Sequence, residues 1–369
     1  MRALATCIAL LLATACTAPS GVVVPVATAS PTHEPGTIAV TALLDLSGTR
    51  APKGDAQRTA MQQWVGQQRA GSPQVRLKIV DLAGSDARLV LELRHVAETG
   101  DADAVVIGAP ALLDEVLVGV IGLVRRPVLF TLPLAEPPGS AADAEGRRWV
   151  FALAPSPEQA ARVAVSALPA RATPTIIVAD GSLQAGREQL AIESELRRDA
   201  RAAPAVMTAG PEQRDSFAQR LRAVAPAGSA IFFAGAAAPY LSPQRLVPAA
   251  DGTTPAVTFL SYLTDAADAG RLGDAAPAVR WPGLRAAIAT PGGTHAATAA
   301  DAMAILAAAG STGSEPDRLR QRIEGDTFAG IATTYAFGPS RHVGADQRDL
   351  VLLAWEGGRI TLARPIGAK

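Results

Sequence analysis

A chain of 369 residues is long enough for two domains, and 49% hydrophobic with 18% charged residues describes a globular protein with a large core. Basic and acidic residues balance at 34 each, and no cluster of lysine or arginine alternates with aromatic residues. This balance argues against the electrostatic footprint that proteins use on a nucleic-acid backbone. We therefore expect no nucleic-acid partner.

The amino-terminal sequence has the features of an export signal. Arg2 is followed by an apolar stretch, residues 3–13, that is too short to span a bilayer. Small residues then lead to Cys16 in the sequence LATAC. This sequence resembles a bacterial lipobox, which implies that the Cys16 thiol is lipidated and becomes the new amino terminus.

The lipobox predicts a signal peptide over residues 1–15; the alternative is an ordinary signal peptide cleaved near Ala18. The other cysteine, Cys7, lies in the part that would be removed, so we expect no disulfide. Residues 16–35 carry four prolines among small residues, which predicts a flexible tether. We expect an exported protein, anchored by lipid to the outer face of the bacterial cytoplasmic membrane or periplasmic.

The first folded unit is predicted just after this tether. The apolar run from Thr37 to Leu44 predicts a buried parallel strand, followed by a polar loop from Asp45 to Gly54. Apolar residues recur at helical spacing from Asp55 onward, which predicts a helix there. Ligands of doubly wound sheets bind outside the carboxyl ends of the strands, so this loop is the first place to expect function.

Strands and helices alternate along the rest of the chain, which predicts an α/β fold with two doubly wound parallel-sheet lobes of similar construction. A Gly-Gly hairpin closes the chain and suits one that crosses between lobes more than once. The further predicted strands are 75–80, 104–108, 127–132, 149–153, 175–179, 204–208, 230–233, 284–289, 350–355 and 360–363. The further predicted helices are one capped by Asp86 and ending at Gly100, then 111–124, 158–168, 187–198, 217–224, 298–309 and 317–324.

A series of short motifs follows this order from residue 36 onward. They are Leu46-Ser47-Gly48 with Gly54, Asp81, residues 105–108, Phe151, Pro155-Ser156 with Gln159, Asp180 with Gly186, Asp215 with Phe217, Asp301-Ala302, residues 328–330, residues 335–338 and Gly357-Gly358. In this order they resemble the solute-binding proteins of branched-chain amino-acid (leucine-binding-like) ABC importers, which have a type I periplasmic-binding fold. The resemblance implies two lobes joined by three crossings, a small polar ligand captured between them, an ABC permease as partner, no cofactor and no enzymatic activity.

The resemblance also implies boundaries for the lobes. Lobe I is expected at residues 36–152 plus 288–334, and lobe II at residues 153–287 plus 335–369. The sequence departs from the family where an α-carboxylate is usually bound, because residues 108–113 carry no hydroxyl and the next loop has none beyond Thr131. Backbone N–H groups of this first loop remain available for an anion.

The ligand-binding candidates come from predicted strand ends and crossings in both lobes. They are Asp45, Ser47, Ala109, Thr131, Phe151, Asp180 and Tyr262. Each has a structural alternative: Asp45 can cap its own loop, Ser47 can form a turn, and an aromatic residue near a crossing can belong to the core. An anchored sensor or interaction protein that keeps the fold without transport is the alternative function.

Enzymatic and metal-dependent functions find little support in the sequence. The four histidines are scattered without paired spacing, which argues against a metal site. Nucleophile-elbow, P-loop and dinucleotide-binding motifs are absent from the sequence. An enzyme on the same scaffold is therefore the weakest alternative.

Overall fold

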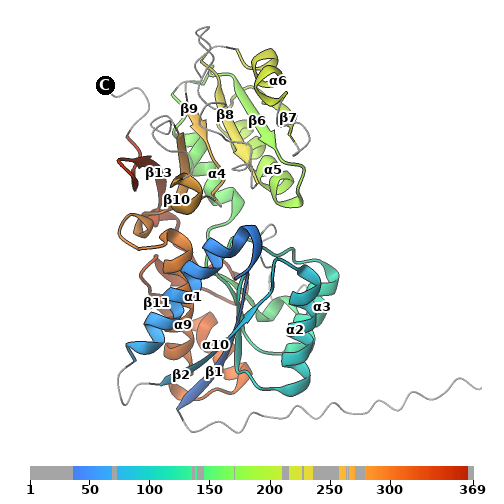
Figure 1. Cartoon of the computed structure of the whole chain (residues 1–369), viewed down its shortest axis with the longest axis vertical. Helices are drawn as coiled ribbons and strands as arrows, with labels where there is room; N and C mark the ends of the chain where they lie inside the picture. The colour runs from blue at the N-terminus through green and yellow to red at the C-terminus, as the bar shows by residue number, and fades with distance from the viewer. Residues whose placement is uncertain are drawn as a thin grey trace, which may run out of the picture.

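The structure is a computed structural model of the chain. It describes residues 36–68, 73–134, 138, 145–169, 171–209, 216–226, 228–235, 257–262, 264, 266–270 and 279–364. The predicted signal peptide, the tether with Cys16, and Asp215 lie outside these residues. No helix in the described ranges is both long and apolar enough to cross a membrane. The described elements form two lobes, one above the other along the long axis (Figure 1).

Lobe I is built on a five-stranded sheet in the order β2-β1-β3-β4-β5, in which every neighbouring pair is parallel. Its central strands are short apolar runs whose side chains are buried on both faces, as parallel sheets covered by helices require. The strands are β1 (Thr37–Leu44), β2 (Gln74–Asp81), β3 (Ala104–Gly108), β4 (Val128–Phe130) and β5 (Val150–Ala152).

Helices cover both faces of this sheet. One face packs in a core cluster with α1 (Ala51–Gly66), α9 (Gly293–Ala309) and α10 (Pro316–Gly325). The other face packs with α2 (Asp86–Thr99) and α3 (Glu115–Val124). The mostly apolar α9 is buried along almost its whole length, because it packs against α1, α10 and the sheet.

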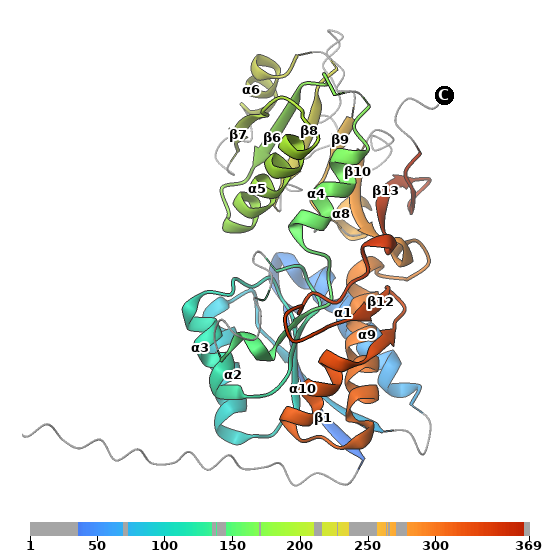
Figure 2. The same cartoon turned by 180° about the vertical axis from the view of Figure 1, so that it is seen from behind.

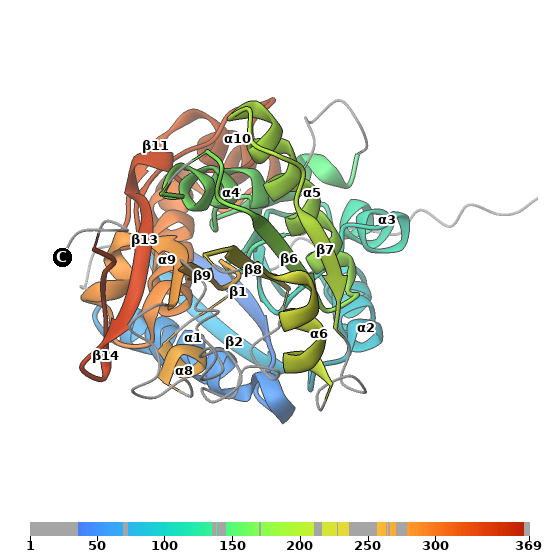
Figure 3. The ribbon, with the colours of Figure 1, turned by 90° about the horizontal axis from the view of Figure 1, so that it is seen from above.

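Lobe II has a seven-stranded sheet in the order β14-β13-β10-β9-β8-β6-β7, which Figure 3 shows from above. All neighbouring pairs from β10 to β7 are parallel, whereas β13 and β14 add an antiparallel hairpin at one edge. The strands are β6 (Thr175–Ala179), β7 (Ala205–Thr208), β8 (Ala230–Ala234), β9 (Val257–Phe259), β10 (Val279–Leu284), β13 (Leu350–Glu356) and β14 (Arg359–Leu362).

The helices α4 (Pro157–Ser166) and α5 (Leu183–Arg198) lie together on one face of the lobe II sheet (Figure 2). The opposite face packs with α6 (Phe217–Val224) and α8 (Ala266–Gly270). The expected α/β fold with two parallel-sheet lobes is thus confirmed. The short 3-10 helices are η1 (Gly48–Arg50), η2 (Arg147–Trp149), η6 (Arg285–Ile288), η7 (Gly310–Thr312) and η8 (Gln347–Asp349).

The chain passes between the lobes three times: from β5 to α4, from β10 to α9, and from η8 to β13. Before the last passage, β11 (Thr327–Ala329) and β12 (Thr334–Ala336) form a small antiparallel pair. Tyr335 of β12 and Phe337 just after it pack into the same core cluster as Phe151 of lobe I. The residue boundaries given above for the two lobes stay a prediction.

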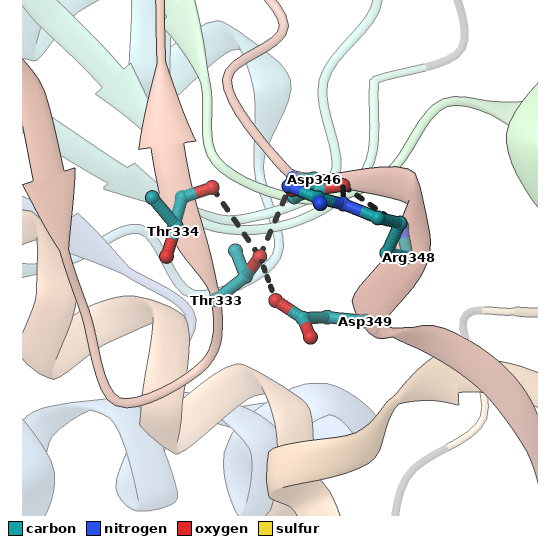
Figure 4. Close-up of polar contacts among 5 residues, drawn as sticks. All are labelled: Thr333, Thr334, Asp346, Arg348 and Asp349. Atoms are coloured by element: carbon teal, nitrogen blue, oxygen red, sulfur yellow. Dashed lines mark hydrogen bonds and ion pairs between the residues drawn. The ribbon is translucent and has the colours of Figure 1, made fainter.

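Polar contacts hold the last passage against lobe I. The Thr333 hydroxyl donates to Asp349 Oδ2 at 2.7 Å and accepts from the Asp346 backbone N–H at 3.3 Å (Figure 4). On the lobe II side, Arg162 of α4 donates to Gln347 Oε1 at 2.8 Å. The 3-10 turn between the lobes is therefore tied to both of them.

Several predicted boundaries are wrong for identifiable reasons. Helix α1 begins at Ala51 instead of Asp55, because Pro52 in its first turn suits a helix start. Helix α3 begins at Glu115 because the Asp114 carboxylate accepts from the Leu117 N–H at 2.8 Å and caps it.

Three further predictions also need correction. Ser85 caps α2, since its hydroxyl accepts from the Arg88 N–H at 3.2 Å, and Asp86 lies inside the first turn. Helix α5 begins at Leu183 because Ser182 caps it. The strand predicted at 284–289 is instead β10, which ends at Leu284 and is followed by η6.

Candidate functional site

The carboxyl ends of the parallel strands in both lobes lie at the boundary between the lobes. In lobe I, β5 ends only a few residues before α4 of lobe II, and the other four strands run parallel to it. In lobe II, β10 ends before α9 of lobe I, and β9, β8 and β6 run parallel to it. We call these two sets of strand ends and their loops the facing edges.

An ion pair joins the two lobes beside the facing edges. Lys53 Nζ in the first turn of α1 lies 2.7 Å from Asp268 Oδ2 in α8. Their side chains are 25% and 14% exposed, so water screens the pair only partly. The pair stabilises the arrangement in which Lys53 of lobe I reaches Asp268 of lobe II.

Asp45 at the end of β1 is 2% exposed and already has two partners. Its Oδ1 accepts from the Gly84 N–H at 2.9 Å, and its Oδ2 accepts from Arg50 at 3.0 Å. The carboxylate therefore links the loops after β1 and β2, which is the structural role considered from the sequence.

Ser47 lies on the exposed part of the same loop. Its hydroxyl donates to Asp81 Oδ2, and Asp81 Oδ1 accepts from the backbone N–H groups of Leu46 and Ala83 at 2.8 Å each. These hydrogen bonds stabilise the ionised form and hold the pKa of Asp81 below its usual value; the bond from Ser47 has the largest effect, and the two N–H groups add to it. Ser47 and Asp81 thus form a closed pair at the rim of lobe I.

Thr131 at the end of β4 is fully buried and faces a residue that the sequence argument missed, Gln57 of α1. The Thr131 hydroxyl donates to Gln57 Oε1 at 2.5 Å, and Gln57 Nε2 donates to the Gly108 carbonyl at 2.9 Å. The Gln57 amide therefore fills the space behind the ends of β3 and β4. The sequence did contain a signal for this role: Gln57 lies four positions before buried Met61, so its polar side chain is on the inward face of α1.

The remaining two lobe I candidates are buried. Ala109 is 4% exposed directly after β3. Phe151 is fully buried in β5, where its ring packs edge-on against Phe337 and stacks on His342 with centroids 4.7 Å apart. Because these ring contacts lie within the core, we leave Phe151 out of the proposed site.

Lobe II contributes Asp180 and Tyr262. Asp180 follows β6, is partly exposed, and its Oδ1 accepts from the Ser182 N–H at 2.9 Å. Tyr262 follows β9, is 6% exposed, and its hydroxyl oxygen accepts from Gln184 Nε2 at 2.5 Å. Burial raises the pKa of Tyr262 well above its usual value, so the hydroxyl keeps a proton that it can donate.

Other residues of lobe II complete its facing edge. Gln184 and Leu183 begin α5, and Leu183 is 67% exposed, which leaves an apolar side chain at this edge. Glu188 lies one turn further along the helix and is buried beneath the ends of β8 and β9. Its position between Ala185 and Ile192, in the helix's buried row, was the sequence signal for it.

Metal and triad chemistry gain no geometric support at these edges. Among the described residues, no group of three or more His, Cys, Asp or Glu side chains could hold a metal ion. Asp301 accepts from the Ile331 and Ala332 N–H groups and from the Tyr335 hydroxyl, which fixes the β11–β12 turn on α9. It therefore acts as a structural acceptor.

Comparisons with known proteins identify the architecture. No protein-family model matches the sequence, and no curated protein matches it. Among solved structures, an extracellular ligand-binding receptor from Rhodopseudomonas palustris HaA2 matches with a TM-score of 0.73 and 16% identity, over 89% of this chain and 100% of that chain.

Two further solved structures agree with the first. A type 1 periplasmic binding protein from Bordetella pertussis Tohama I matches with a TM-score of 0.73 and 16% identity, covering 89% of this chain and 99% of its own. An R. palustris ABC-transporter solute-binding protein in complex with benzoate matches with a TM-score of 0.66 and 16% identity, covering 90% of this chain and 98% of its own. The chain has the type I periplasmic-binding fold, which confirms the predicted resemblance at the level of fold.

Proposed function

We propose that this protein captures a small polar molecule between the facing edges of its two lobes and presents it to an ABC importer in the membrane. The observation that carries this proposal is the placement of polar groups from both lobes at one boundary, bridged by the Lys53–Asp268 ion pair. Solved structures of this fold carry the names of ligand-binding receptors and ABC-transporter substrate-binding proteins. The protein performs no covalent chemistry on its ligand.

The ligand is held mainly from lobe II. Asp180 accepts hydrogen bonds from an ammonium or hydroxyl group, and Tyr262 donates its phenolic proton. Lobe I contributes backbone groups near Ala109 and the rim pair of Ser47 and Asp81. Capture shifts the protein towards the closed arrangement only in so far as the ligand contacts that arrangement more favourably.

The protein acts outside the cytoplasm, held to the membrane by a lipid on Cys16. The support for this part is the sequence alone, in the export signal and the lipobox that precede the folded chain. Two acyl groups on the diacylglyceryl unit with a third on the new amino terminus satisfy the condition for stable attachment.

A thermal-shift screen tests solute capture. Purified protein is tested against L-leucine, L-glutamate, benzoate, a dipeptide, glucose and putrescine. A compound at a hundredfold excess over its Kd stabilises the fold by about 2.7 kcal/mol, which shifts the melting temperature measurably. We expect at least one compound to do so, with the shift lost in Asp180→Asn.

A sensor or interaction protein that keeps the fold without transport is the second candidate. The observation that favours it is the internal pairing of Asp45, Ser47 and Thr131, whose side chains form hydrogen bonds with other groups of lobe I. Failure of every compound in a protein shown to be folded would favour this candidate over transport.

A further inference from the structure

A buried carboxylate connects two neighbouring strand ends of lobe II. Glu188 on α5 is 5% exposed, and its Oε2 accepts from the Gly235 N–H after β8 and from the Ser261 hydroxyl after β9, both at 2.8 Å. The backbone N–H of Tyr262 donates to the same carboxylate. One side chain thus receives hydrogen bonds from the ends of β8 and β9 together.

These donors determine where Tyr262 lies. Ser261 and Tyr262 are consecutive, so two of the three hydrogen bonds hold the short segment that carries the Tyr262 ring. The third holds Gly235, whose φ of +78° and close contact with Asp180 leave no room for a side chain. A Cβ at Gly235 would lie 2.7 Å from either Asp180 oxygen. The segments that touch Glu188 are therefore the segments that shape the lobe II edge.

The surroundings of Glu188 disfavour its charge. Apolar side chains of α4, α5, β8 and β10, with Leu260 after β9, lie around it, and the cavity beside it measures about 10 Å³, at the lower limit for a single water. Burial, opposed by the three hydrogen bonds and reinforced by the Asp180 charge, raises the pKa of Glu188 to about 7. Burial, with the negative charges of Glu188 and Glu158, raises the pKa of Tyr262 well above its usual value. The Tyr262 hydroxyl therefore stays protonated around neutral pH.

We propose that Glu188 is a positioning residue of the ligand site and that only its ionised form holds Tyr262 in the position seen here. The inference rests on the proposed function, because it assigns Tyr262 to ligand capture. An ionised carboxylate accepts from all three donors at once, whereas a protonated one carries an O–H that needs an acceptor of its own.

Ser261 is the partner that can respond to this change. A backbone N–H can only donate, but the Ser261 hydroxyl can turn and accept a hydrogen bond from the O–H of protonated Glu188. Protonation therefore removes the hydrogen bond that Ser261 donates in the structure and loosens the segment after β9. Acidification through neutrality is expected to move Tyr262 and weaken ligand capture.

NMR of tyrosine rings labelled with ¹³C measures this movement without a ligand. The chain has three tyrosines, at 240, 262 and 335, and Tyr262→Phe identifies the signal of interest. Between pH 5 and 9 we expect the Tyr262 signal to shift with a midpoint near 7. Glu188→Gln, which mimics the protonated form, is expected to hold the signal at its acid position. A Tyr262 signal that ignores pH, or that still titrates in Glu188→Gln, would overturn the inference.

Two further variants separate positioning from general damage to the fold. Glu195→Gln makes the same chemical change on the same helix, at a buried carboxylate paired with Arg198 at 2.6 Å, and is expected to keep the pH-dependent shift of the Tyr262 signal. Ser261→Ala removes a donor to the ionised carboxylate, which disfavours ionisation. The midpoint of the Tyr262 signal shift is therefore expected to lie at a higher pH in this variant than in the wild type. A fall of the midpoint in Ser261→Ala would contradict the assigned hydrogen bond.

A binding measurement then separates this inference from the proposed function. For a compound found in the screen, affinity is expected to fall about tenfold from pH 8 to pH 6, since the ionised fraction falls from about ten elevenths to one eleventh. Glu188→Gln is expected to bind weakly at both pH values. If the Tyr262 signal shifts with pH as expected but none of the six compounds binds, the proposed function fails and Glu188 still positions Tyr262. If a compound binds equally at both pH values, the role of Glu188 in capture is refuted.

Discussion

The facing edges of the two lobes differ in the protonation and exposure of their polar groups. In lobe I, Asp45, Ser47 and Thr131 at the strand ends are bound by Arg50, Asp81 and Gln57 of the same lobe. In lobe II, a carboxylate with a pKa near 7 lies beneath a tyrosine that keeps its proton, beside a partly exposed Asp180.

If the proposed function is right, this difference teaches that the strand ends of one fold can serve stability in one lobe and recognition in the other. A side chain whose hydrogen bonds are satisfied internally gains little from a ligand, because the ligand only exchanges one partner for another. A group that burial has brought near its titration point changes its hydrogen bonding with a small change of environment. We therefore expect lobe I to act as the fixed platform and lobe II as the responsive side.

The tightness of the lobe I edge gives the largest predicted effect. A Cβ at Gly54 in α1 would lie 1.9 Å from the Asp45 carbonyl oxygen, a backbone atom that cannot turn away. Gly54→Ala is expected to lower the free energy of unfolding by about 3 kcal/mol or more, measured by urea denaturation. Gly66→Ala, in the same helix with nothing within 4 Å of the new Cβ, is the control and should be neutral or slightly stabilising. Equal losses in both variants would contradict the close packing of α1 on the β1 loop.

The next effect distinguishes lobe II by its pH dependence. Glu188 keeps its proton up to about pH 7 in the folded protein but loses it near 4.5 in the unfolded chain. The folded state therefore binds more protons in this window, and its stability falls as pH rises. At about 1.4 kcal/mol per pH unit, the wild type should lose about 3 kcal/mol relative to Glu188→Gln between pH 4.5 and 7. Parallel stability curves for the two proteins would contradict the raised pKa.

The buried pair of Thr131 and Gln57 tests the internal pairing of lobe I. Thr131→Val leaves the Gln57 carboxamide oxygen without its donor in a fully buried place, which is expected to cost about 2 kcal/mol of unfolding free energy. The double variant with Gln57→Leu should recover part of this loss, as a double-mutant cycle by thermal denaturation measures. Additive losses would show that the two side chains do not depend on each other.

The smallest predicted effect concerns the contact between the lobes. Lys53→Met is expected to cost about 1 kcal/mol or less, and the loss should shrink in high salt. Arg58→Met is the control, because the exposed pair of Arg58 and Asp55 lies within α1 and does not join the lobes. Small-angle scattering should show a larger radius of gyration for Lys53→Met than for Arg58→Met. Identical scattering would contradict a role for the Lys53 pair between the lobes.

Elements that local pattern determines were predictable from the sequence. The strands at 104–108 and 175–179 match the structure because each is a short run of buried apolar residues with a polar end. Strand β10 was missed because Arg280, Pro282 and Gly283 interrupt its pattern, and Pro282 is unusual inside a sheet. Helix starts shifted wherever a side-chain cap or a first-turn proline decided them.

The site was predictable only in part, since strand-end residues can be placed by topology but their partners cannot. Asp45, Ser47, Ala109, Thr131 and Asp180 do follow strands at the facing edges, and Tyr262 follows β9, which was not predicted. Gln57 and Glu188 were not predicted because their partners are distant in the chain, at least 51 positions away for Gln57 and at least 47 for Glu188. Each was marked only by a polar residue in the buried row of a helix. The ligand-binding roles of all these residues stay proposals.

The most direct test of the account is scattering of the purified protein with and without the first compound that the thermal-shift screen identifies. If the molecule is captured between the lobes and held from lobe II, the radius of gyration decreases on binding in the wild type and in Ser47→Ala, and does not change in Asp180→Asn. Binding without any decrease, or a decrease that survives Asp180→Asn and is lost in Ser47→Ala, would contradict the division of roles between the two edges.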